Sequence, residues 1–104
     1  MLASLSAGTS AGDDAEAQPR AGNPPPHYPV AARRALREGR AVLRVVVSRD
    51  GEGREVRVAE SSGTPILDAA ALDAVRAWRF APARRNGVAI EDVILVPVVF
   101  RLMP

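Results

Sequence analysis

The sequence predicts an α+β fold in which two helices pack on one face of a three-stranded antiparallel sheet. Two segments alternate apolar and polar residues, one has apolar residues at helical spacing, and the longest apolar run is rich in Val and Ile. A chain of 104 residues suits one small domain with a modest core. Residues 28–104 are predicted to form this domain.

The first 27 residues are predicted to be a disordered, Pro-rich linker tail. They contain almost no large apolar side chain after Leu5, so burial cannot offset the entropy lost on ordering. The segment ends in Pro24-Pro25-Pro26, which favours a stiff extended conformation. Residues 1–27 are therefore assigned to a linker.

A short helix and a β-hairpin are predicted next. Pro29 suits the first position of a helix, and Gly39 is the expected C-terminal stop. Arg40–Val47 and Glu55–Glu60 both alternate as strands do. The polar, Gly-rich residues 48–53 between them are expected to form the turn.

A second helix is predicted over Pro65–Trp78, with Thr64 as its N-cap. Apolar residues at helical spacing form its buried stripe: Leu67, Ala71, Val75 (or Ala74) and Trp78. Ala83–Asp92 follows as a polar loop with a turn at Asn86-Gly87, and Val93–Leu102 is the third strand.

The order of these elements restricts the topology of the sheet. The second helix returns the chain, so the third strand runs parallel to the second and pairs antiparallel to the first, through a right-handed crossover. The predicted sheet order is therefore second–first–third. The third strand lies at an edge of the sheet.

The third strand is apolar on both faces, and it contains a proline. Pro97 has no N–H and belongs at an edge with its nitrogen outward, so Val93, Leu95 and Val99 also direct their N–H groups outward. The helices cover one face; the other needs a cover, which is a partner, a second copy or the N-terminal segment. Two interpretations stay open: Pro97 protects the edge from aggregation, or the edge binds a strand.

Composition argues against several classes of protein. The chain has no Cys and a single His, and it shows no paired carboxylates or nucleophile–base pair, so we expect no enzyme, no metal site and no cofactor. No apolar run is long enough to span a membrane. From Tyr28 onward 13 Arg face 9 acidic residues, a net +4, which is too weak a basic footprint for a nucleic-acid binder.

An ordered set of short motifs covers about residues 26–102. It comprises Tyr28-Pro29, Ala32, Gly39, Val42 and the Gly53 turn; Ser61-Ser62-Gly63, Leu67-Asp68, Ala70-Ala71-Leu72, Ala74-Val75, Trp78-Arg79-Phe80 and Pro82; and Asn86-Gly87, Val96-Pro97-Val98 and Phe100-Arg101-Leu102. At these spacings the sequence resembles the C-terminal domain of TonB-type energy transducers, and the predicted topology agrees with the fold of that family.

The resemblance implies a function. Family members bind the Ton box, a short segment of TonB-dependent outer-membrane transporters for siderophores, haem or cobalamin. The Ton box adds as a strand to the third strand, which here is Val93, Ile94, Leu95, Val96, Pro97, Val98, Val99 and Phe100. The resemblance further implies a periplasmic domain, an inner-membrane anchor upstream of this segment and an ExbB/ExbD-type motor driven by the proton gradient.

Several alternatives remain open at this stage. Pro25, His27, Tyr28, Arg84 and Arg85 are candidate accessory contacts with the receptor. For Tyr28 the other interpretation, which its aromatic ring favours, is packing at the helix entrance; for the two arginines it is a solvated loop, since exposed charges contribute little individually. The exposed edge also allows a homodimer. The alternative function is a TonB-like or TolA-like interaction module of another periplasmic assembly.

Overall fold

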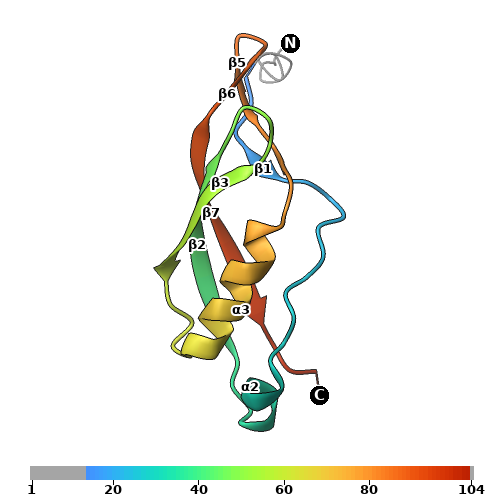
Figure 1. Cartoon of the computed structure of the whole chain (residues 1–104), viewed down its shortest axis with the longest axis vertical. Helices are drawn as coiled ribbons and strands as arrows, with labels where there is room; N and C mark the ends of the chain where they lie inside the picture. Colours follow the sequence, from blue (N-terminus) through green and yellow to red (C-terminus); the bar gives the residue numbers. More distant parts are fainter. Residues whose placement is uncertain (1–13, 104) are drawn as a thin grey trace, which may run out of the picture.

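The computed structural model describes residues 14–103. Residues 1–13 of the predicted linker lie outside the described part. Along the chain the elements are β1 (Gln18–Pro19), α2 (Val30–Arg34), β2 (Gly39–Val47), β3 (Gly53–Glu60), α3 (Pro65–Arg76), β4 (Phe80–Ala81), β5 (Ala83–Arg85), β6 (Val88–Ile90) and β7 (Asp92–Phe100) (Figure 1).

The central sheet has three antiparallel strands in the order β3-β2-β7, which confirms the predicted fold class and sheet order. β2 pairs with β7 over nine residues in one unbroken register, from Gly39↔Phe100 to Val47↔Asp92. Its pairing with β3 shifts register twice, between Val42 and Leu43 and between Val46 and Val47. The two edges of the sheet therefore differ in regularity.

The core lies between α3 and the sheet. α3 packs on β2 and β3, and its buried residues are Leu67, Ala71 and Val75. Trp78, the fourth residue of the predicted stripe, lies beyond the end of the helix and is only partly buried. The helix ends at Arg76, two residues before the predicted end, because Ala77 already leaves the helical hydrogen-bond pattern. The largest fully buried side chains are Phe80, Leu43, Leu67, Val45, Val47 and Val75.

The end of the first helix differs from the prediction. α2 ends at Arg34, and Leu36, with a φ of 56°, takes the left-handed conformation expected of a C-terminal glycine. The prediction that Gly39 stops the helix is wrong, because Gly39 begins β2. A Cβ at Gly39 would lie 2.8 Å from the carbonyl oxygen of Ser62, so close backbone approach explains the glycine there.

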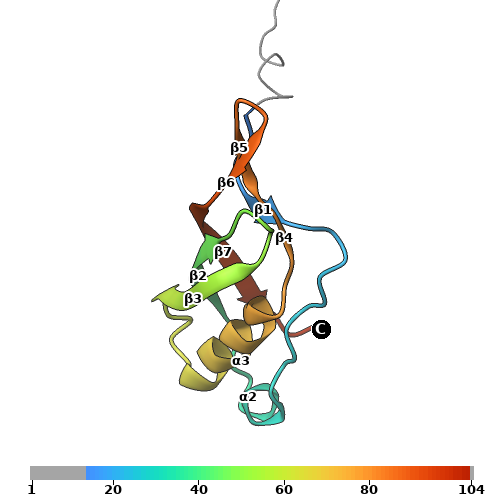
Figure 2. The same ribbon diagram turned by 45° about the horizontal axis from the view of Figure 1, so that its top comes forward.

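The predicted polar loop over Ala83–Asp92 is also wrong in part, since it forms the β5–β6 hairpin. Asn86 and Gly87 have φ values of 53° and 79°, the positive pair that a two-residue hairpin turn of type I′ requires. The turn itself was predicted. The hairpin lies at the end of the molecule opposite α2 in both views (Figures 1 and 2).

The described part of the predicted linker, residues 14–27, contacts the domain. β1 pairs antiparallel with β4, and Ala17 is buried. The amide group of Asn23 donates to the carbonyl oxygen of Arg79 (2.9 Å) and accepts from its N–H (2.8 Å). Trp78 Nε1 donates to the carbonyl oxygen of Pro24 (2.8 Å). The first part of this segment therefore lies beside β4 and β5, and its later part runs along the side of α3; residues 14–27 are called the strap (Figure 1).

Candidate strand-binding edge

β7 has one strand neighbour, β2, on one side only, and no strand of residues 14–103 pairs with its other side. The side chains of Val96, Val98 and Phe100 face the core and are buried. Outward side chains are exposed: Val93 by 43%, Leu95 by 63% and Val99 by 52%. The edge is therefore open and its solvent-facing side is aliphatic.

The register determines which backbone groups of β7 point away from the sheet. Pro97 faces Val42 and has no N–H, so this pair is one that exchanges no hydrogen bonds. Positions two residues apart share their direction, so Leu95 and Val99 also direct their N–H and C=O groups away from β2. Neither N–H has a partner among the described residues.

Val93 shares this outward direction, but its N–H is not free. Its outward N–H donates to the Asp92 carboxylate (2.8 Å), a local contact that short acidic side chains often make. The signal for this cap in the sequence is the Asp at the first residue of the strand, which was not among the predicted features. The free donors therefore lie at Leu95 and Val99, on either side of Pro97.

The neighbouring strand gives the open face a basic border. Opposite Leu95 and Val99 on β2 lie Arg44 and Arg40. Arg44 pairs with Glu55 of β3 across 3.7 Å, while both side chains remain about half exposed. This face therefore has an aliphatic column on β7 beside a charged column on β2.

The candidate accessory residues occupy three separate places. The Tyr28 ring packs edge-to-face on Phe100, with the centroids 5.4 Å apart, and its hydroxyl donates to the carbonyl oxygen of Arg37. Tyr28 thus packs at the entrance of α2, next to the end of β7. Arg84 and Arg85 lie on the β5–β6 hairpin, at the end of the molecule opposite α2 (Figure 2).

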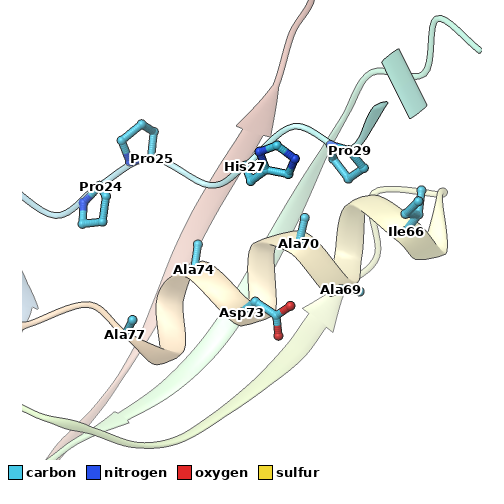
Figure 3. A pocket seen from close by; sticks show the side chains of 10 residues that line it. All are labelled: Pro24, Pro25, His27, Pro29, Ile66, Ala69, Ala70, Asp73, Ala74 and Ala77. Carbon is cyan, nitrogen blue, oxygen red and sulfur yellow. The ribbon is translucent and has the colours of Figure 1, made fainter. Parts of the chain in front are cut away.

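Pro25 and His27 line an open groove between the strap and α3. Its volume is about 440 Å³, and the facing wall is mostly alanine with Asp73 at one side (Figure 3). The two residues therefore face α3 rather than the outward side of β7. Within residues 14–103 no group of three or more His, Cys, Asp or Glu side chains is arranged to hold a metal ion.

A family model, Gram-negative bacterial TonB protein C-terminal, matches residues 24–102. The chain belongs to this TonB C-terminal family. Membership confirms both the resemblance and the prediction that the domain serves interaction rather than catalysis.

Relatives and a solved structure agree with this assignment. Protein tonB2 of Pseudomonas aeruginosa is 44% identical over 80 residues, 77% of this chain and 30% of that protein. Protein TonB of Xanthomonas campestris pv. campestris is 42% identical over 78 residues, 75% of this chain and 35% of that protein. The solution NMR structure of the Pseudomonas aeruginosa TonB CTD superposes with a TM-score of 0.70 at 25% identity, covering 88% of this chain and 91% of that one.

The chain spans about a third of the length of these curated TonB relatives. The family match begins at Pro24, inside the strap, and ends at Leu102, just after β7. The TonB domain therefore includes every strand of the central sheet and both helices. No helix in the described residues is long and apolar enough to cross a membrane.

Proposed function

We propose that this TonB domain binds the Ton box of an outer-membrane receptor by strand addition at the outer side of β7. The whole protein would lie in the periplasm, anchored in the inner membrane, and transmit work from an ExbB/ExbD-type motor for uptake of siderophore, haem or cobalamin. The observation that carries the proposal is the unpaired side of β7, with free N–H groups at Leu95 and Val99 beside exposed aliphatic side chains.

The chemistry of binding is non-covalent. Main-chain hydrogen bonds to Leu95 and Val99 supply affinity, and contact with the outward aliphatic side chains selects an apolar partner strand. Pro97 leaves a gap between the two donors, so the paired window is short. A short, small interface releases its partner readily, which suits a coupler that must engage and disengage repeatedly.

The test is an NMR titration of the 104-residue chain with a synthetic Ton-box peptide. Amide shifts concentrated on Val93–Phe100 are expected. Amide shifts that instead concentrate on His27 and α3 would move the site to the groove and contradict the β7 proposal. A homodimer at the same edge would show as concentration-dependent shifts of β7 before any peptide is added.

Leu95→Pro and Leu95→Ala form a matched pair for this titration. Leu95→Pro removes an outward N–H while leaving the inward ladder to β2 intact, so peptide binding should fall at least tenfold. Leu95→Ala keeps the N–H and removes only side-chain contact, so its loss should be smaller. Equal binding by Leu95→Pro and the unsubstituted chain would show that β7 does not pair with the peptide.

A further inference from the structure

The surface around α2 concentrates positive charge. Here the basic end denotes residues 30–40 together with residues 99–103, which line adjoining hollows and lie at one end of the molecule in both views (Figures 1 and 2). It contains five arginines and one acid, Glu38, for a formal +4. The other nine arginines and eleven acids of the sequence sum to −2, so the net positive charge of the chain comes from the residues of the basic end.

The arginines of the basic end are Arg33, Arg34, Arg37, Arg40 and Arg101. All four ion pairs of the described residues lie elsewhere, on β2, β3, the β6–β7 turn and Arg79. Glu38 accepts a hydrogen bond from the Leu102 N–H (2.6 Å), which uses part of its carboxylate locally. The positive charge of this end is therefore available to an external anion.

Aliphatic side chains project among these arginines. Leu36 is 76% exposed and Met103 is 88% exposed, and Val30 is also exposed. Leu36 holds a positive φ, a left-handed conformation that Asn or Gly adopts with less strain than leucine does. Neither its burial nor its backbone conformation stabilises the fold, so a stability role does not account for a leucine at this position.

Two open hollows join these features into one surface. The first, of about 440 Å³, is lined by Tyr28, Arg33, Leu36, Arg101, Leu102 and Met103. The second, of about 330 Å³, is lined by Glu38, Gly39, Arg40, Val99, Phe100 and Arg101. Arg101 belongs to both, so the two hollows adjoin, and together they bring Arg33, Arg40 and Arg101 next to exposed aliphatic side chains.

From this arrangement we infer that the basic end docks on the surface of an anionic phospholipid bilayer. Protruding aliphatic chains ringed by arginines match the boundary between headgroups and acyl chains, where the charge stays among phosphates and the side chains enter the apolar layer. Attraction of about 1 kcal/mol per arginine gives weak, salt-sensitive binding. Because β7 ends at this surface, docking would hold one end of the strand-binding edge close to the bilayer.

The experiment is co-sedimentation of the 104-residue chain with vesicles of phosphatidylcholine containing about a third phosphatidylglycerol, compared with pure phosphatidylcholine. Binding is expected only to the anionic vesicles and should weaken steeply as salt rises. Absence of binding to anionic vesicles at low salt would overturn the inference. Equal sedimentation with both kinds of vesicle would overturn it as well, since the arginines would then be irrelevant.

Matched variants identify the surface that binds. Arg33→Gln with Arg101→Gln should lower affinity about 25-fold, from about fivefold per arginine. Arg84→Gln with Arg85→Gln removes the same charge from the β5–β6 hairpin at the other end and should change affinity less than threefold. Equal losses from the two pairs would show attraction by net charge alone and overturn the inference.

Leu36→Asn separates membrane insertion from folding. Asn tolerates the positive φ, so the variant should be as stable as the unsubstituted chain or slightly more so, while vesicle affinity falls about threefold to tenfold. Unchanged vesicle affinity would contradict insertion of Leu36. Binding to soluble polyglutamate as tight as binding to vesicles would assign the surface to an acidic protein and overturn the bilayer assignment.

Discussion

β3 and β7 are both edge strands of one sheet, yet they present different edges to an incoming strand. β3 carries charges outward, with Arg54, Glu55 and Arg57 all in ion pairs, and its register against β2 shifts twice. β7 keeps one register over nine residues and exposes aliphatic side chains. Charges and bulges discourage edge-to-edge pairing, so the comparison shows one edge closed to a new strand and one left open.

The two strands share β2 as their partner, so the difference between them resides in their own residues. Two features of β7 limit pairing, and each removes a single outward donor: Pro97 has no N–H, and the Asp92 carboxylate accepts from the N–H of Val93. A strand that needed only protection from aggregation would more effectively carry charge, as β3 does. This favours the strand-binding interpretation of β7 over the protective one.

The largest expected effect comes from placing proline at a residue of β7 whose N–H points toward β2. Val96 is buried and faces Leu43 in a pair that exchanges hydrogen bonds with β2. Val96→Pro removes an inward donor, leaves a buried carbonyl unpaired and disturbs the core, so the free energy of unfolding should fall by about 3–5 kcal/mol. Urea denaturation followed by circular dichroism measures this.

Leu95→Pro is the control for Val96→Pro, one residue away on the same strand. Its N–H points outward, so the free energy of unfolding should change by less than about 1 kcal/mol. Similar destabilisation by the two substitutions would mean that the outward and inward backbone groups of β7 are not distinct. The distinction between backbone groups that bond to β2 and backbone groups left free for a partner strand would then be lost.

A smaller effect is expected when the gap in the outward ladder is filled. Pro97→Val restores an N–H between those of Leu95 and Val99 and keeps a β-branched side chain at the edge. One added hydrogen bond should tighten Ton-box peptide binding about threefold to tenfold, and it should also increase self-association. Isothermal titration calorimetry and analytical ultracentrifugation measure the two effects.

An unchanged peptide affinity in Pro97→Val would show that the peptide pairs with only one side of the gap. Tighter self-association without tighter peptide binding would indicate that Pro97 acts mainly as protection. Either result would show which part of the open edge of β7 is used for binding and which part Pro97 protects. Pro97→Ala, which restores the donor with little side chain, separates the backbone contribution from side-chain contact.

The sheet and its order were predictable from sequence because each depends on local patterns. Alternation in β2 and β3, helical spacing in α3 and the Val-rich run of β7 each identify an element, and chain direction then leaves one arrangement. Pro97 identified the edge through a property of proline alone. These features required no knowledge of distant contacts.

Features that depend on distant contacts were not predictable in this way. Asn23 bonds to Arg79 across 56 positions in the chain, and neither residue type indicates this pairing. The strap was therefore expected to be a linker, since its composition lacks large apolar residues. Leu36 takes a left-handed conformation that its residue type does not favour. Gly39, which the sequence suggested for that position, is instead required by its close approach to Ser62.

The smallest expected effect concerns the junction where β3 passes into α3. Burial alone would raise the pKa of the Asp68 carboxyl, but hydrogen bonds from the Ser61 and Ser62 hydroxyls and the Ser62 N–H outweigh it and lower this pKa. A carboxyl whose pKa is lower in the folded state than in the unfolded state stabilises the fold at pH values above the unfolded-state pKa, which is about 3.9 for Asp. This stabilisation disappears as the pH falls through the folded-state pKa. Asp68→Asn should therefore lower the free energy of unfolding by about 0.5–1 kcal/mol at pH 7, with the difference shrinking below about pH 4.

Urea denaturation across this pH range tests the effect, with Asp73→Asn, an exposed carboxylate on the same helix, as the control. A difference between Asp68→Asn and the unsubstituted chain that persists undiminished at low pH would contradict an electrostatic origin. Asp68 lies on the β3 side of the sheet, away from the outward groups of β7. Ton-box binding by Asp68→Asn should therefore match that of the unsubstituted chain, and a loss of binding would mean that the two edges are coupled through α3.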